Sequence, residues 1–295
     1  MLKNLPSESK AVAFGLTAVL LWSTVASAFK IALNYVPPII LLFGAALVSV
    51  IVLAVILQCQ GKLSLALKQL AQLNLNTFLL GLINPVFYYL ILFEAYDRLP
   101  AQVAQPVNYT WAITLSLLSV PILGHRLNRR DLLGLVLGYA GVVIISMAGK
   151  NVTGHLDPIG LALALLSTLL WAGYWLLNTK SKKDPIIALF HNFLISLPVL
   201  SLLILFWPTI EMQWHWQGLT AIAYVGLFEM GLAFVFWQLA LKHTNNSARI
   251  GTLIFISPFI SLFLISAILK EPLQLQSFLG LGFIITGVVI AQRQT

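Results

Sequence analysis

The chain has 295 residues, of which 59% are hydrophobic and only 9% are charged, and its mean hydropathy is +0.93. Soluble domains carry roughly 25% charged residues, so this composition excludes an ordinary soluble protein and indicates an all-α polytopic membrane protein. The net charge of +8 does not indicate nucleic-acid binding, because the chain lacks a nucleic-acid-binding motif and basic residues of membrane proteins gather in loops beside anionic lipid.

Cysteine and histidine usage narrows the chemistry further. The single cysteine, Cys59, excludes a disulfide framework, and its place at the end of an apolar run predicts a packing role. The five histidines are scattered without ligand-like spacing, so neither a metal site nor a cofactor is expected.

Runs of about 20 apolar residues, bounded by charge, proline or polar clusters, predict ten transmembrane helices. Their expected ranges are 11–29, 37–57, 76–96, 103–123, 131–149, 158–177, 186–206, 217–240, 247–269 and 274–292. The first run ends in Ala26-Ser27-Ala28, which imitates a signal-peptide cleavage site. The run exceeds a signal core of about 7 to 15 residues, so we expect it to be retained as a helix.

Two of these helices carry a polar residue near the middle. Asn84 is followed by Pro85. Proline removes a backbone donor, so the pair predicts a kink that leaves a carbonyl free toward a cavity, with a packing kink as the alternative. Glu229 interrupts an otherwise apolar run. A carboxyl group at that depth costs roughly 2.5 to 3.5 kcal/mol on insertion scales, so we expect it to face a polar cavity; a protonated glutamate bonded to a neighbouring helix is the alternative.

Aromatic and amide side chains at helical spacing extend this candidate cavity. An apolar cavity with aromatic faces and a few polar groups fits a small amphipathic ligand, whose ammonium group would be attracted by the rings. An interfacial belt is the alternative for tryptophans, and we assign Trp207, Trp214 and Trp216 to it. The candidate substrate-binding residues are Trp22, Asn84, Tyr88, Asn108, Trp111, Trp171, Tyr174, Trp175 and Glu229.

Polar residues near helix ends have simpler interpretations. Glu94, Asp97 and Arg98 close the third helix, and we expect them to pair locally. His191 and Asn192 lie near one end of the seventh helix, where they would line a vestibule or snorkel to the interface.

The sequence also contains an internal repeat. Leu20-Leu21-Trp22 matches Leu169-Leu170-Trp171, and Gly134 and Gly141 match Gly280 and Gly287. The chain is therefore expected to form two five-helix repeats, residues 1–150 and 151–295. Because five is odd, the second repeat enters the membrane inverted, as in many secondary transporters.

Aligning the third helix on the eighth places Gly81 on Gly226 and Asn84 on Glu229. The repeated glycines of the fifth and tenth helices lie at near-helical spacing, which predicts close helix packing.

Lysine and arginine counts predict the orientation. With the N-terminus inside, 13 of these residues fall on the cytoplasmic side and four on the other, which favours both termini in the cytoplasm. The expected location is the cell (inner) membrane. The four outer residues are Lys30, Arg98, Lys150 and Lys270.

Several stretches resemble the EamA-type drug/metabolite transporter superfamily over essentially the whole chain. They are Leu21-Trp22-Ser23-Thr24, the stretch ending Phe255-Ile256-Ser257-Pro258, the turn Lys270-Glu271-Pro272-Leu273 and the helix 280–290. Within the superfamily, residues 107–111 and 171–174 are similar to stretches of bacterial aromatic amino acid exporters. The resemblance implies a ten-helix, pseudo-symmetric carrier that moves small metabolites, commonly amino acids, out of the cell, with the fifth helix of each half as scaffold. Arg126 stands where the pattern has the acidic residue that Glu271 supplies in the second half, which favours a structural helix-turn role for Glu271.

The expected function is secondary transport by alternating access around a midplane site, most directly export of amino acids or related amphipathic compounds. Export or import of other metabolites or drugs, and a channel, are the alternatives. A channel normally needs several subunits or a continuous polar lining. An enzyme is not expected, because the helices carry neither a Ser/His/Asp set nor paired carboxylates. The expected partners are a small-molecule substrate, the lipid bilayer and, as a candidate coupling ion, the proton; the oligomeric state is left open.

Overall fold

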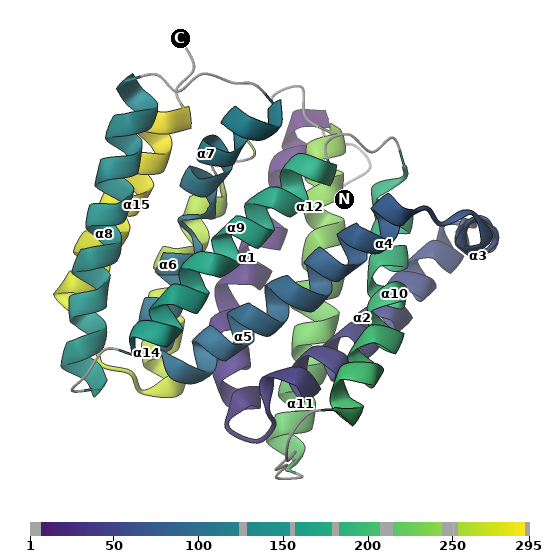
Figure 1. The fold of residues 1–295 in the computed structure, drawn as a ribbon, viewed down its shortest axis with the longest axis horizontal. Coiled ribbons are helices and arrows are strands. Elements are labelled where there is room, and N and C mark those ends of the chain that lie inside the picture. The colour runs from purple at the N-terminus through teal and green to yellow at the C-terminus, as the bar shows by residue number, and fades with distance from the viewer. Residues whose placement is uncertain are drawn as a thin grey trace. The chain divides into compact units, whose positions relative to one another are not determined.

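The computed structural model describes residues 7–123, 129–153, 157–178, 183–206, 215–243, 250 and 253–292. Every regular element in this part of the chain is helical (Figure 1). The elements are α1 (Ser7–Leu33), α2 (Pro38–Cys59), α3 (Leu63–Gln69), η2 (Leu70–Gln72), α4 (Leu75–Gly81), η3 (Leu82–Phe87), α5 (Tyr88–Arg98), α6 (Ala101–Asn108), α7 (Trp111–Leu123), α8 (Arg129–Thr153), α9 (Pro158–Asn178), α10 (Pro185–Leu205), α11 (Trp216–Tyr224), η4 (Val225–Ala233), α12 (Phe234–His243), η5 (Leu253–Phe255), α14 (Ile256–Leu269) and α15 (Leu275–Gln292).

The helices confirm a polytopic membrane protein. Six of them, within the described ranges, are long and apolar enough to cross a bilayer. These are Ser7–Leu33, Pro38–Cys59, Leu75–Arg98, Pro158–Leu177, Pro185–Leu205 and Trp216–His243, and shorter apolar helices cover Leu132–Ile145, Leu253–Leu269 and Leu275–Ile290. The helix expected over 103–123 is divided, because α6 ends at Asn108 and α7 begins at Trp111.

The connection between α2 and α4 differs from the expected loop. It contains the short helix α3, followed by the 3-10 turn η2. Cys59, at the end of α2, is exposed, so the predicted packing role of this thiol is wrong. An apolar run shows where a helix ends but not whether its last residue meets a neighbour.

By its contacts the chain divides into two compact units. The first unit comprises Met1–Val86 and Lys182–Ile260, and the second comprises Phe87–Ser181 and Ser261–Thr295. Each unit therefore contains segments from both expected repeats, and each is described below by itself.

In the second unit, α8 packs closely against α15 through glycines. A Cβ atom on Gly141 would lie 2.5 Å from the carbonyl oxygen of Gly280, and one on Gly287 would lie 2.4 Å from that of Gly134. Gly134 of α8 meets Gly287 of α15, and the later Gly141 meets the earlier Gly280, so the two helices run antiparallel. The predicted packing role of these glycines is confirmed, since a side chain larger than hydrogen does not fit between the backbones.

In the first unit, two glycines make corresponding contacts. A Cβ on Gly226 would lie 2.5 Å from the carbonyl oxygen of Ala45, and one on Gly81 would lie 3.2 Å from that of Asn192. Ala45 is the eighth residue of α2 and Asn192 is the eighth residue of α10. Thus η4 contacts α2 at the same position along the helix, its eighth residue, at which α4 contacts α10.

The next turn of α2 and α10 repeats this correspondence. The second contact of each glycine is with the eleventh residue of the helix, Val48 in α2 and Ile195 in α10. The residue that follows is a fully buried serine in both helices, Ser49 and Ser196. The Ser49 hydroxyl donates to the carbonyl oxygen of Gly226 at 2.8 Å, and that of Ser196 donates to its own helix.

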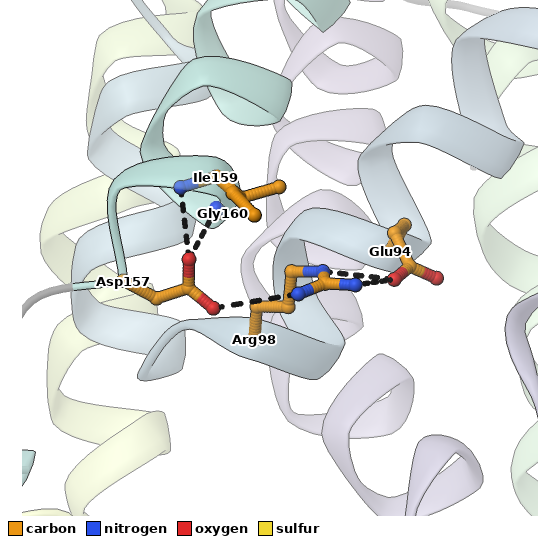
Figure 2. A network of polar contacts seen from close by, with 5 residues as sticks. All are labelled: Glu94, Arg98, Asp157, Ile159 and Gly160. Carbon is orange, nitrogen blue, oxygen red and sulfur yellow. Dashed lines mark hydrogen bonds and ion pairs between the residues drawn. The ribbon is translucent and has the colours of Figure 1, made fainter.

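An ion network joins the end of α5 to the start of α9 in the second unit (Figure 2). The Arg98 guanidinium pairs with Glu94 at 2.8 Å and with Asp157 at 3.6 Å. The other Asp157 oxygen accepts from the backbone N–H groups of Ile159 and Gly160 at 2.8 and 3.0 Å, so it caps α9. The amide of Gly160 is the main cause that lowers the pKa of Asp157. The predicted local pairing of Arg98 is confirmed.

Glu271 caps α6 within the same unit. Its carboxylate accepts from the backbone N–H groups of Ala101 at 2.9 Å and Gln102 at 3.3 Å. The Gln102 side chain donates to the carbonyl oxygen of Pro272 and accepts from Ser277. The favoured structural role of Glu271 is thus confirmed, while its counterpart Arg126 lies outside the described residues.

Candidate functional site

Four aromatic side chains of the second unit form one group, here called the aromatic cluster: Tyr88, Trp171, Tyr174 and Trp175. Tyr88 begins α5, and the other three follow one face of α9. The rings of Tyr88 and Trp171 stack with centroids 4.6 Å apart, and Tyr174 continues the stack at 6.0 Å from Trp171. Trp175 meets Trp171 edge-on at 5.8 Å. Helical spacing on α9 therefore places three of the nine predicted residues on one face, and Tyr88 of α5 joins them as a fourth.

A fifth predicted residue supplies the polar edge of this cluster. The Asn108 amide nitrogen donates to the Ser167 hydroxyl at 2.9 Å, and the Asn108 oxygen accepts from the Tyr88 hydroxyl at 3.5 Å. Ser167 in turn donates to the carbonyl oxygen of Ala164 at 2.7 Å. This chain of hydrogen bonds fixes the orientation of the amide beside the rings.

Two buried polar atoms near this edge have no hydrogen-bond partner among the described residues. They are the indole nitrogen of Trp175 and the side-chain oxygen of Gln105, which lies one turn before Asn108 on α6. Buried polar groups in proteins are nearly always paired, so a free donor and a free acceptor are positions where a ligand gains hydrogen bonds. Gln105 was not among the predicted residues, although its spacing of three from Asn108 places both side chains on one face of the helix.

Trp22 lies in the first unit, where it packs between α1 and α12. Its ring meets Phe234 edge-on at 5.9 Å and Trp237 at 5.3 Å. The side chain is buried in this contact. The matching tryptophans of the two repeats, Trp22 and Trp171, therefore each pack on aromatic residues, and each does so within its own unit.

Asn84 and Glu229, the residues aligned by the repeat, both lie in π-helical segments of the first unit. Asn84 is in η3, with φ −138° and ψ 117°, and Glu229 is in η4. π-helical turns inside α-helices are rare and frequent at functional sites. Pro85 predicted the first break, whereas only the glycines beside Glu229 hinted at the second.

Burial separates these two residues from ordinary surface polar groups. Asn84 is fully buried and Glu229 is 7% exposed. Neither polar atom of the Asn84 amide has a hydrogen-bond partner in the part of the chain that the structure describes. An amide left in this state carries the full cost of its desolvation, about 1 to 3 kcal/mol, unless a ligand pairs with it.

The remaining candidates are placed as follows. Trp111 begins α7, is partly exposed and does not join the ring contacts of the aromatic cluster given above. Gly226 and Gly231 lie against α2, so close packing explains both glycines. Trp216 is 66% exposed, as expected of an interfacial belt, whereas Trp207 and Trp214 lie outside the described residues.

The His191 side chain is buried and does not snorkel to the surface, so that alternative is wrong, while the vestibule stays a prediction. Its ring is fully buried, and Nε2 lies 2.9 Å from the carbonyl oxygen of Ala66 on α3. This contact was not predictable, because α3 itself was not expected. Within the described ranges, no group of three or more His, Cys, Asp and Glu side chains is arranged to hold a metal ion.

The sequence of this chain is similar to those of known transporters. The model of the EamA-like transporter family matches the chain twice, over residues 9–147 and 158–292. The chain is 25% identical to the uncharacterized transporter YvbV of Bacillus subtilis, over 100% of this chain and 95% of that protein. It is 27% identical to the aromatic amino acid exporter YddG of Ancylobacter novellus, over 88% of each. A solved crystal structure with 22% identity superposes over 96% of both chains with a TM-score of 0.68, which supports the fold alone.

Proposed function

This chain belongs to the EamA-like transporter family, and we propose that it is a secondary carrier for small amphipathic metabolites, with amino acids as the leading class and export as the direction. The family and the apolar helices make it a multi-pass membrane transporter. The finer substrate class is supported by the similarity to an aromatic amino acid exporter and by the chemistry of the second unit.

The aromatic cluster is the observation that carries this proposal. Tyr88, Trp171 and Tyr174 stack into one buried aromatic group, and Trp175 and Gln105 add a donor and an acceptor without a hydrogen-bond partner among the described residues. Flat faces with few polar groups suit a small molecule that has an apolar body and a polar end. Aromatic faces also attract ammonium groups, by about 0.5 to 2 kcal/mol each.

Glu229 and Asn84 are proposed to serve the transport cycle in the first unit. An ionised Glu229 would pair with an ammonium group, because an opposite charge stabilises the carboxylate. A neutral Glu229 would instead carry a proton through the cycle. Both roles use a carboxyl group that the fold keeps at 7% exposure within a π-helical segment.

Alternating access by two inverted repeats, 1–150 and 151–295, completes the proposal. Two matches of the family model, one in each half, support it. The corresponding contacts of Gly81 and Gly226 on α10 and α2 support it as well, as do the reciprocal contacts between α8 and α15. The proposed location is the inner membrane, and the distribution of lysine and arginine favours both termini in the cytoplasm.

Transport by purified protein in proteoliposomes tests the role of the aromatic cluster. Trp171→Leu is expected to weaken transport up to about tenfold, since an aromatic pair contributes about 0.5 to 1.5 kcal/mol beyond its buried area. Trp216→Leu is the matched control, because the same change is made at a ring that is 66% exposed. Equal transport by the two variants, with both folded, would overturn the assignment of the cluster to substrate binding.

The role of Glu229 is tested by the isosteric change Glu229→Gln. We expect transport to fall and its pH dependence to be lost while the thermal midpoint stays close to that of the wild type. Asn84→Asp places a second carboxyl group at the aligned position and is expected to alter the pH dependence. Unchanged transport by Glu229→Gln at every pH would reject both roles of this carboxyl group.

A further inference from the structure

The segment from Lys62 to Gln72, here called the interfacial segment, contains α3 and η2 and belongs to the first unit. Figure 1 shows α3 nearly end-on, so it crosses the direction of the neighbouring α2 and α4 instead of extending either. Both neighbours are apolar spans, and they end at Cys59 and begin at Leu75. A short helix that turns aside where two spans end lies at the level of the lipid headgroups.

Two large apolar side chains of this segment are exposed, beside polar ones such as Ser64 and Lys68. Leu65 and Leu67 are 49% and 50% exposed, while Ala66 between them is fully buried. Apolar side chains are also exposed on the neighbouring spans, where Val55 and Leu75 are 57% and 72% exposed. A bilayer around the spans explains these exposed apolar side chains without a protein cover.

The charges around the segment are predominantly positive. The sequence from residue 60 to residue 93 contains no aspartate or glutamate. Lys62 binds Asp184 at 2.6 Å, and the Lys183 ammonium donates to Thr77 at 2.6 Å. Lys68 is exposed. These three lysines and one aspartate leave a local charge of plus two, which complements anionic headgroups.

The segment is attached to α10 by two contacts. His191 of α10 lies 2.9 Å from the carbonyl oxygen of Ala66, and the Lys62 ion pair holds Asp184, which caps α10 by accepting from Ile186 and Ile187. A lipid bound to the segment therefore stabilises the start of a transmembrane helix.

We propose that the interfacial segment, together with Lys183, forms a binding surface for anionic phospholipid headgroups. Leu65 and Leu67, on either side of the buried Ala66, insert at the boundary between headgroups and acyl chains, and Lys68 faces the phosphates. Lys62 and Lys183, held by Asp184 and Thr77, add positive charge beside them. Each lysine near such a surface contributes about fivefold in affinity, which corresponds to roughly 1 kcal/mol. The binding surface depends on the membrane location of the chain and not on the identity of its substrate.

The test titrates phosphatidylglycerol or phosphatidylcholine into the detergent-purified protein and follows the thermal midpoint. Phosphatidylglycerol is expected to raise the midpoint more than phosphatidylcholine does. Lys68→Gln is expected to weaken the apparent affinity for phosphatidylglycerol about fivefold. Lys270→Gln is the matched control, because it removes the same charge from an exposed lysine whose ammonium group donates to the carbonyl oxygen of Ala267.

Fluorescence supplies a second measurement. The single cysteine, Cys59, is exposed beside the segment, so an environment-sensitive dye attached there reports on lipid contact without a new mutation. In nanodiscs, Leu65→Ser combined with Leu67→Ser is expected to shift the dye emission to the red, because the dye then lies in a more aqueous environment. The proposal would be overturned if the two lipids had equal effects on the midpoint, or if Lys68→Gln and Lys270→Gln behaved alike. It would also be overturned if the leucine variant changed its oligomeric state with no dependence on lipid. The last result would assign the surface to a second copy of the chain.

Discussion

The packing of α8 on α15 makes a quantitative prediction about two neighbouring glycines of α15. A Cβ on Gly280 would lie 2.5 Å from Cγ1 of Ile145 and 2.6 Å from the carbonyl oxygen of Gly141. A Cβ on Gly282 would meet no atom within 4 Å. Replacement by alanine gives both positions the same gain in helix propensity, about 0.8 to 1 kcal/mol, so the difference between the variants isolates the clash.

The clash at Gly280 is not relieved by a side-chain rotation, because one of the two atoms belongs to the backbone. Overpacking of this kind costs about 1 to 3 kcal/mol. With a sensitivity of about 2 to 4 °C per kcal/mol, Gly280→Ala should melt roughly 2 to 12 °C below Gly282→Ala. Size-exclusion chromatography after heating in one detergent measures both midpoints. Equal midpoints, or a higher one for Gly280→Ala, would refute the close approach of α8 and α15.

Three further predictions concern the helix ends. Glu271→Ala should lower stability by about 0.5 to 2 kcal/mol, measured by thermal unfolding, because two amides at the start of α6 lose their acceptor. Burial opposes ionisation of Asp184, but hydrogen bonds from Lys62, Ile187 and Ile186 outweigh it and lower the pKa of this carboxyl group. The ionised carboxylate therefore stabilises the fold fully above the pKa of the unfolded state, about 3.9, and this stabilisation is lost as the pH falls through the lower pKa of the folded state. Below about pH 4 the thermal midpoint of Asp184→Asn should therefore vary less with pH than that of the wild type. With the N-terminus inside, Cys59 should react with a membrane-impermeant maleimide in inside-out vesicles and not in intact cells; the reverse pattern would contradict the predicted orientation.

The long helices were predictable from the sequence because the length of an apolar run alone decides whether it can span the bilayer. An apolar run of about 20 residues spans the hydrocarbon core whatever it later packs against. The glycines of α8 and α15 were predictable for a similar reason, since their spacing alone places them on one face. The break at Asn84 followed from the missing donor of Pro85, which is a local property of the chain.

Features that depend on contacts between distant segments were not predictable. The contact of His191 with Ala66 joins residues 125 positions apart, and it requires α3, whose seven residues are too few to give a periodic signal. The π-helical segment at Glu229 contains no proline, so the sequence did not predict a break there. The helical spacing of Gln105 from Asn108 was visible in the sequence, but only the structure shows that its side-chain oxygen has no hydrogen-bond partner among the described residues.

The central claim is that this chain carries small amphipathic metabolites across a membrane, and counterflow in proteoliposomes tests it most directly. Vesicles are loaded with one unlabelled member of a panel of amino acids, nucleosides and cationic drugs, and uptake of the same labelled compound is followed across a pH gradient. The predicted result is transient accumulation of amino acids, with the aromatic members strongest. Absence of counterflow for every amino acid, in protein that still shows a cooperative thermal transition, would contradict the claim.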